Sequence, residues 1–242
     1  MKTLIIIPSR LSATRLPGKP LLKINGLSIV SHVLKRAESA NIGEVVVAAE
    51  DQEIIDDVKK NGGNAILTNK NHKSGTDRIY EAFLKLARND IDLIMNIQGD
   101  EPAIDIEDIK NLDNKMKVND SKIGTLAAKI SNLKKFQNEN VVKVIVKEPL
   151  DQNTFPYAET FVRKAEDKRN TFHHIGIYSY KVESLKKFIS LDQSKNEIEN
   201  RLEQLRALDN KININVALAN SSPIGVDTKD DYLAIKKIME YK

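Results

Sequence analysis

Two short runs of consecutive apolar residues, at positions 4–7 and 45–49, constrain the fold of this chain more than any other feature. Such runs are typical of strands that are buried on both faces. Apolar residues recur at helical spacing between them, and strand and helix patterns keep alternating up to a strand expected at 93–97. This alternation is typical of parallel strands joined by helices. We therefore predict an α/β fold whose mostly parallel sheet is covered by helices on both faces.

The second half of the chain has a different pattern. Its expected elements are three strands, a polar loop and two helices, at 125–130, 141–146, 175–180, 147–171, 197–208 and 230–241. A length of 242 residues suits one substantial domain with an insertion. We predict a single domain over residues 1–242, with an inserted, partly antiparallel lobe at about 125–190.

The composition excludes several classes of protein. Lys and Arg total 38 and Asp and Glu total 34, and these charges are mixed along the chain, so no nucleic-acid partner is expected. The absence of cysteine removes disulfides, thiolate nucleophiles and cysteine-based zinc sites. The apolar run at 4–7 is too short for a secretory segment, and no run approaches membrane-spanning length. We expect a cytoplasmic protein without a membrane partner.

The loop after the first strand, residues 8–20, carries three cations, Arg10, Arg15 and Lys19, together with small hydroxyl residues. Ligands of open α/β sheets bind at the carboxyl ends of the strands, where this loop begins. Guanidinium and ammonium groups at this position favour a polyphosphate-binding loop over the alternative, a basic loop that is merely solvated. Neither the dinucleotide-binding glycine pattern nor the P-loop pattern is present, which argues against a dehydrogenase or an ATPase.

Two carboxylates are candidate metal ligands. Asp100 follows the strand at 93–97 and would lie at the same sheet edge, where a carboxylate beside phosphates is a natural Mg²⁺ ligand. The alternative for Asp100 is a turn or cap residue. Asp227, within 225–228, would by itself suit a cap of the last helix, but paired with Asp100 it would complete a metal site.

Three further segments carry polar side chains of interest. Ser74 and Gly75 precede a helix, where they serve either as a cap or as contacts to a base or ribose. His173 and His174 open an apolar strand without further zinc ligands, where either one of them donates a hydrogen bond to substrate or both are structural. The pair at 203–204 lies in a helical pattern whose charges are mostly solvated.

Seven motifs in this order give the chain a family resemblance. They are IPSR with SATRLPGKP (7–10 and 12–20), HKSGTDR (72–78), NIQGDEP (96–102), VKV (142–144), HIGIY (174–178), LEQLR (202–206) and GVDT (225–228). Over essentially its whole length the sequence resembles the 3-deoxy-manno-octulosonate (Kdo) cytidylyltransferases, or CMP-Kdo synthetases. The resemblance implies a Rossmann-like, three-layer nucleotide-diphospho-sugar transferase fold and a homodimer built through the inserted lobe.

The same resemblance implies a reaction. CTP and the octulosonic sugar acid Kdo would give CMP-Kdo and pyrophosphate, with Mg²⁺ as cofactor, for lipopolysaccharide biosynthesis. The anomeric hydroxyl would attack the α-phosphorus in line, without a covalent enzyme intermediate. Such a displacement needs positioning and charge neutralisation more than a protein nucleophile.

Site residues follow from the resemblance, position by position. The residues implied for the nucleotide are Arg10, Ser12, Ala13, Thr14, Arg15, Lys19, Ser74, Gly75, Arg78, Gln98 and Asp100. Those implied for the sugar acid are Gln98, Arg163, His174, Tyr178, Glu203 and Gln204. Asp100 and Asp227 would hold the metal, and with Arg15 and Lys19 they form the implied catalytic set.

Several alternatives stay open. The segment 160–163 reads Thr-Phe-Val-Arg where the family usually has an aromatic residue followed by Phe-Ser-Arg, and Asn200 stands where it often has an acid. Another sugar acid, such as 8-amino-Kdo or a sialic-acid-like sugar, is therefore one alternative, and a non-catalytic nucleotide-binding module is another. A sugar-1-phosphate nucleotidyltransferase would be expected to carry a lysine in place of the pair at 203–204. A glycosyltransferase would need an Asp-x-Asp motif, and the one at 90–92 precedes its strand instead of following it.

Overall fold

The computed structural model describes residues 1–12 and 15–240. It contains two compact units, Met1–Ile109 with Pro223–Lys242 (unit 1) and Lys110–Ser222 (unit 2). Both boundaries of unit 2 lie outside the lobe predicted at 125–190. No helix among the described residues is long and apolar enough to cross a membrane.

Unit 1 contains four parallel strands in the order β6-β1-β4-β5. The four apolar residues at 4–7 are wholly buried, as a strand covered on both faces requires. The parallel sheet expected from the sequence is therefore confirmed. Its strands are β1 (Thr3–Ser9), β4 (Gly43–Ala49), β5 (Asn64–Leu67) and β6 (Leu93–Asn96).

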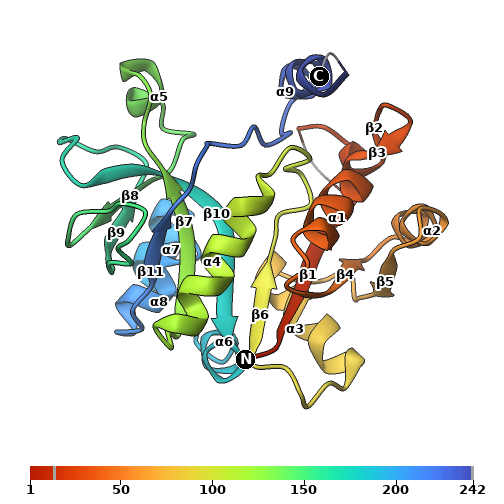
Figure 1. Ribbon diagram of the computed structural model, residues 1–242, viewed down its shortest axis with the longest axis horizontal. Coiled ribbons are helices and arrows are strands. Elements are labelled where there is room, and N and C mark those ends of the chain that lie inside the picture. The colour runs from red at the N-terminus through yellow and green to blue at the C-terminus, as the bar shows by residue number, and fades with distance from the viewer. Residues whose placement is uncertain (13–14, 241–242) are drawn as a thin grey trace. The chain divides into compact units, whose positions relative to one another are not determined.

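Helices join these strands, as the ribbon in Figure 1 shows. The strand order reverses after β5, so right-handed crossovers place the third helix opposite the first two. Ser28 caps the first helix by accepting a hydrogen bond from the backbone nitrogen of Ser31 at 3.2 Å. The helices of this part are α1 (Ile29–Ser39), α2 (Gln52–Lys60), α3 (Gly75–Leu86) and α4 (Ile106–Val118), which contains the unit boundary.

A small core fixes the end of the first loop. Ile24 and Ile29 pack with Val226 and Ile235 of the C-terminal segment, and all four are buried. Leu16 and Leu22 pack against them, which ties the cationic loop to the segment that carries Asp227. The elements here are the short 3₁₀ helix η1 (Lys19–Leu21), the strands β2 (Lys23–Ile24) and β3 (Leu27–Ser28), and α9 (Lys229–Glu240).

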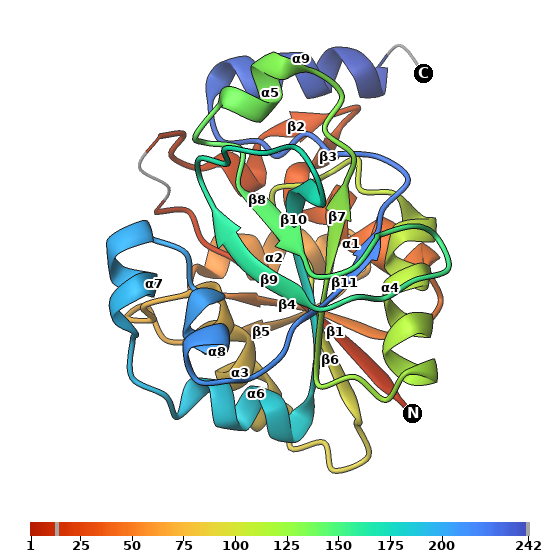
Figure 2. The same cartoon turned by 90° about the vertical axis from the view of Figure 1, so that its left-hand side faces the viewer.

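Unit 2 contains a mixed group of strands, which Figure 2 shows from the side. β10 is antiparallel to both β7 and β8, β8 is antiparallel to β9, and β11 is parallel to β7. The partly antiparallel character expected of this part is confirmed. The strands are β7 (Ile123–Ala128), β8 (Lys143–Val146), β9 (Ala158–Val162), β10 (Thr171–Lys181) and β11 (Asn215–Leu218).

β9 lies where the sequence predicted only a polar loop. Ala158 and Phe161 are buried while Glu159 is exposed, so the strand alternates only weakly over its five residues. Pairing with β8 supplies the hydrogen bonds that make it a strand. Such tertiary pairing is difficult to predict from a short segment rich in polar residues.

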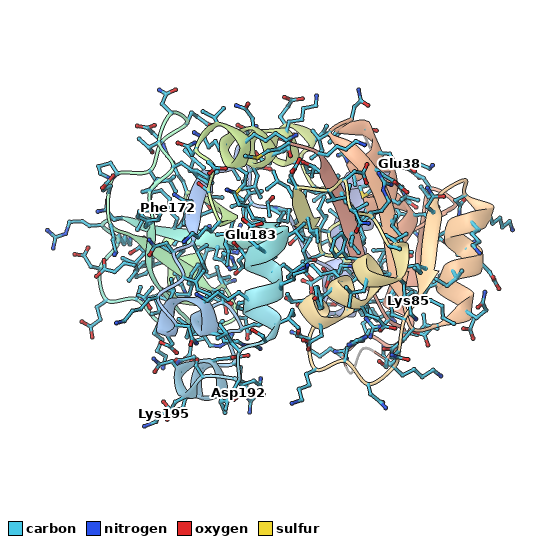
Figure 3. All side chains as sticks on the ribbon, turned by 90° about the horizontal axis from the view of Figure 1, so that it is seen from below. Glu38, Lys85, Phe172, Glu183, Asp192 and Lys195 are labelled. Carbon is cyan, nitrogen blue, oxygen red and sulfur yellow. The ribbon has the colours of Figure 1, made fainter. Side chains whose placement is uncertain are left out.

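The helix predicted at 197–208 is two helices. α7 ends where Arg201 takes a left-handed conformation with φ of +53°, and α8 begins four residues later. Glu203 and Gln204 therefore lie on a turn, and the prediction that they lie on a helix is wrong. Figure 3 labels Asp192 and Lys195 beside the start of α7 and Glu183 in the first turn of α6. The helices of unit 2 are α5 (Leu133–Gln137), α6 (Val182–Ile189), α7 (Lys195–Asn200) and α8 (Leu205–Asp209).

Candidate active site

A polar cavity of about 340 Å³ opens in unit 1 at the carboxyl ends of the parallel strands. It brings together predicted residues from four separate segments. His72 and Lys73, which were not predicted, also line it. The predicted residues that line it are Arg10, Arg15, Lys19, Ser74, Gly75, Arg78, Gln98, Asp100 and Asp227. Ala13 and Thr14 lie outside the described residues, and Ser12 does not line the cavity.

Gly99 allows the loop after β6 to approach β1 closely. A Cβ atom at this position would lie 2.8 Å from the carbonyl oxygen of Pro8, which is backbone and has no freedom to rotate away. Any side chain would therefore push residues 98–100 off the end of β1. The glycine thus sets Asp100 beside the loop that carries the cations.

The two candidate metal ligands face one shared cation. Nζ of Lys19 lies 2.6 Å from Oδ2 of Asp100 and 3.2 Å from Oδ1 of Asp227, and it donates to the carbonyl of Val226 at 2.9 Å. Arg15 pairs with the other carboxylate oxygen of Asp227 at 2.9 Å. Burial opposes the charge of Lys19, but the two carboxylates outweigh it and hold its pKa above the usual value.

Asp227 is not the cap of the last helix. Thr228 takes that place, because its Oγ1 accepts from the backbone nitrogen of Asp231 at 3.2 Å. Asp231 in return accepts from the backbone nitrogen of Thr228 at 2.8 Å. The Asp227 carboxylate is thereby left to pair with Lys19 and Arg15.

The donor set here fits a magnesium ion. Hard carboxylate oxygens are its preferred ligands, and Mg²⁺ is usually held by one or two carboxylates together with substrate phosphates. In the part of the chain that the structure describes, no group of three or more His, Asp or Glu side chains forms a complete metal cage. Burial, reinforced by the charge of Asp100, raises the pKa of Glu101 to about 8, so its carboxyl group is neutral at pH 7.

Arg78 lines the cavity, but its guanidinium group is already bound. It forms a buried ion pair with Glu50, and it donates to Oγ1 of Thr68 at 2.7 Å and to the carbonyl of Asn69 at 3.2 Å. Ser12 donates to the other oxygen of Glu50 at 3.1 Å. These two predicted nucleotide contacts therefore meet at one protein carboxylate.

Glu50 and Asp51 are site residues that the sequence reasoning missed. Asp51 accepts the backbone N–H of Leu11 at 2.7 Å, so the two acids together fix two consecutive residues of the first loop. Their position could have revealed them, because they directly follow the strand at 45–49 and end at the same sheet edge.

Ser74 forms a capping box with Asp77 at the start of α3, as the structural alternative predicted. Its Oγ accepts from the backbone nitrogen of Asp77 at 3.1 Å, and Asp77 accepts from the nitrogen of Ser74 at 3.1 Å. The cap leaves Gly75, which follows it, at the cavity wall.

A second predicted group gathers in unit 2. Tyr178, Glu203 and Gln204 line a void of about 20 Å³, which has room for roughly one water molecule. The ring of His174 lies 5.5 Å from that of Tyr178. Gln98 belongs to unit 1, so this group holds the predicted sugar residues of unit 2 alone.

Both histidines of β10 are uncharged at pH 7. Burial, with a smaller effect of His173, lowers the pKa of His174 to about 3. Burial and the nearby Lys135 and Lys143 lower that of His173 to about 4. Oγ1 of Thr125 donates to the carbonyl of Ile177 at 2.7 Å and lies 3.1 Å from Nε2 of His174, so the histidine is the donor in that second bond.

Arg163 contacts backbone oxygens in this structure. Its guanidinium donates to the carbonyls of Asn200 at 3.0 Å, Arg201 at 3.2 Å and Glu139 at 3.4 Å. Lys143, from the VKV motif, donates to the carbonyl of Arg163 at 2.7 Å. The predicted contact of Arg163 with a sugar carboxylate stays a prediction, and the observed role is to hold the end of α7.

Asp90 and Asp92, the Asp-x-Asp alternative, precede β6. Nζ of Lys2 lies 2.5 Å from Asp90, and the backbone nitrogen of Lys2 donates to Asp92 at 2.6 Å. Neither residue lines the cavity described above.

Known proteins resemble this chain along nearly its full length. Residues 4–214 match a family model described as cytidylyltransferase. The 3-deoxy-manno-octulosonate cytidylyltransferase of Nitrobacter winogradskyi is 41% identical over 241 residues, covering 98% of this chain and 94% of the relative. The enzyme of the same name from Thermodesulfovibrio yellowstonii is 40% identical over 251 residues, covering 99% and 98%.

Solved structures agree with these relatives. A CMP:2-keto-3-deoxy-manno-octonic acid synthetase complexed with CTP superposes with a TM-score of 0.89 at 34% identity, covering 100% of this chain and 99% of the other. A 4-diphosphocytidyl-2C-methyl-D-erythritol synthase from Anaerococcus prevotii gives a TM-score of 0.67 at 13% identity, which shows the fold alone.

Proposed function

We propose a function from one premise: this chain belongs to the 3-deoxy-manno-octulosonate cytidylyltransferases of the cytidylyltransferase family. The enzyme couples CTP with the sugar acid Kdo and releases pyrophosphate. The observation that carries this proposal is the set of three cations and two carboxylates at one cavity of unit 1. A binding module would need the cations but not two carboxylates placed to hold a divalent ion.

The chemistry asks the protein for positioning and charge neutralisation. The anomeric hydroxyl attacks the α-phosphorus in line and gives up its proton to solvent, the bond from that phosphorus to the bridging oxygen breaks, and pyrophosphate leaves with the electron pair. Arg10, Arg15 and Lys19 bind the triphosphate and neutralise the charge that grows on the leaving group. No side chain needs to act as a nucleophile.

Asp100 and Asp227 are the residues that would hold Mg²⁺. The ion supplies charge neutralisation at the phosphates when it is bound. Lys19 pairs with both carboxylates and Arg15 pairs with Asp227, so the protein already balances their charge within the site.

For the sugar acid we propose Gln98 in unit 1 and His174, Tyr178, Glu203 and Gln204 in unit 2. Hydroxyl, amide and carboxylate groups suit the many hydroxyls of an octulosonic acid. His174 is neutral at pH 7 and supplies hydrogen bonds, not charge. Arg163 is the proposed partner of the sugar carboxylate, and reaching it would require part of its guanidinium to leave the α7 carbonyls.

We further propose a homodimer that works in the cytoplasm and supplies lipopolysaccharide biosynthesis. The support is the family membership and a sequence free of cysteine, which suits a reducing compartment.

Pyrophosphate release tests the function directly. CTP, UTP and ATP are each combined, with Mg²⁺, with Kdo, 8-amino-Kdo and a sialic acid. We expect release with CTP and Kdo and little with any other pair. Release with CTP and another acid would keep the mechanism and change the substrate, whereas no release with any pair would overturn the proposal.

A further inference from the structure

We propose that Arg206, held by Glu197, is a positioning residue for the sugar-acid site, because it fixes the turn that carries Glu203 and Gln204. This inference rests on the proposed function, which places those two residues at the sugar acid. Arg206 itself contacts no substrate in this proposal. It acts through the turn, by contacts that all lie within unit 2.

The pair between Arg206 and Glu197 is buried and two-pronged. Nε donates to Oε2 of Glu197 at 2.8 Å and Nη2 donates to Oε1 at 2.6 Å, with side-chain exposures of 6% and 5%. Two parallel bonds fix the plane of the guanidinium as well as its position. A buried group held in this way is a rigid support for its neighbours.

The same guanidinium contacts two walls of the small void. Cζ of Arg206 lies 4.7 Å from the ring centre of Phe188 on α6, and its Nη2 lies 3.8 Å from Oε1 of Glu203. Phe188, Glu203 and Gln204 all line that void. One side chain therefore connects α6, α7 and the turn between α7 and α8.

The turn needs such a support because it has no regular helix of its own. Arg201 ends α7 with φ of +53°. Three single-turn backbone bonds follow, from the nitrogens of Leu205, Arg206 and Ala207 to the carbonyls three residues earlier, at 3.1, 3.1 and 3.2 Å. Arg163 holds the near end of the turn through the carbonyls of Asn200 and Arg201. Arg206 holds the far end.

Glu197 binds Arg206 as a carboxylate anion. Burial alone would raise its pKa, but Arg206 together with Gln193 overcomes this and lowers the pKa below the usual value. Ser194 also binds it in a capping box at the start of α7. Because both members are charged and buried, replacing either one leaves the other as an unpaired buried charge, which the turn must shift to accommodate.

The test compares Arg206→Lys and Glu197→Gln with the wild type. Lysine keeps the charge but not the planar fork, and glutamine keeps the shape but not the charge. KM is measured separately for Kdo and for CTP, with kcat. We expect KM for Kdo to rise about tenfold, as the loss of one charged hydrogen bond would give, while KM for CTP stays within about twofold.

Matched controls come from the same helix. Lys195 and Glu199 form an exposed pair at 3.8 Å on α7, and Lys195→Met or Glu199→Gln should leave both KM values unchanged. Glu197→Gln combined with Arg206→Lys should raise KM for Kdo by less than the product of the two single effects, because both act on one pair.

The outcomes separate the two proposals. A wild-type enzyme without pyrophosphate release from CTP and Kdo would overturn the proposed function and this inference with it. An active wild type whose variants melt at lower temperature, yet keep KM for Kdo, would overturn the inference alone. Equal rises in KM for CTP and Kdo would also overturn it, since they would indicate a general loss of structure.

Discussion

Nζ of Lys19 lies 2.6 Å from Oδ2 of Asp100, so a cation expected to bind phosphate and a carboxylate expected to bind metal are partners of each other. Each group neutralises the other inside a polar cavity, where an unpaired charge would be costly. We therefore expect phosphate to replace Asp100 as the partner of Lys19, and a metal ion to replace Lys19 as the partner of Asp100.

Lys19→Met tests the phosphate role. Methionine keeps the length of the side chain and removes the charge, so CTP should bind roughly tenfold or more weakly, as expected for loss of a charged hydrogen bond. CMP, which lacks the β- and γ-phosphates, should bind as before. Calorimetric titration with both nucleotides checks this, and Lys85→Met on α3 is a control at an exposed lysine (Figure 3). An equal loss for CTP and CMP would contradict the assignment.

Asp100→Asn tests the metal role. The amide keeps the shape but loses the charge that a divalent ion prefers, so turnover with Mg²⁺ should fall roughly 100-fold or more. Binding of Mn²⁺, followed by electron paramagnetic resonance, should weaken in parallel without a change in the circular dichroism of the fold. Normal turnover with weakened Mn²⁺ binding would mean that the ion seen is not the catalytic one.

The sequence predicted which residues meet at this cavity largely because Arg10, Lys19 and Asp100 lie in loops that follow buried strands. Apolar runs located the strands, and the ends of parallel strands share one edge, so Lys19, Asp100 and their neighbours had to meet. What it did not predict is which protein groups those side chains bind. Arg78 and Ser12 meet at Glu50, and such a pairing depends on side-chain positions that no periodicity records.

Glu50→Gln should lower the free energy of unfolding by roughly 3 kcal/mol, because Arg78 would keep a buried charge without its counter-ion. Urea denaturation of the wild type and the variant measures this. Glu44→Gln is the matched control, since Glu44 lies on β4, the strand that Glu50 directly follows, and pairs with Arg88 at 2.5 Å in a partly exposed position. That change should cost no more than about 1 kcal/mol. Equal losses would show that burial of the Glu50 pair carries no special weight.

The turn at 203–204 was predicted less well for a different reason. Residues 197–208 keep helical apolar spacing throughout, and nothing in that pattern marks the left-handed conformation of Arg201. The break is stabilised by Arg163, which lies 38 residues earlier and donates to the carbonyl of Arg201. The spacing of apolar residues indicates only the local preference for a helix. It could not predict this break, because the break is stabilised by a contact with a residue distant in the sequence.

The histidines of β10 should make stability depend on pH. Their folded pKa values, about 4 for His173 and about 3 for His174, lie below the ordinary value near 6.5. Between those limits the unfolded chain binds more protons, so acidification from pH 7.5 to 5 favours unfolding. Each histidine contributes up to about 1.4 kcal/mol per pH unit below its unfolded pKa. The stability lost on acidification should therefore be smaller in a His173→Gln, His174→Gln variant than in the wild type.

Urea denaturation at pH 7.5 and 5 measures both proteins, and the quantity compared is the change between the two pH values. This choice removes any constant cost of the substitutions. It also cancels Glu101, whose raised pKa of about 8 gives a slope of the opposite sign in both proteins. Glu81, with a pKa lowered to about 2 by Lys85, Asn69 and His72 against the effect of burial, loses its contribution mainly below pH 4.5. An equal change in wild type and variant would mean that the two histidines titrate in the folded protein as they do in the unfolded chain.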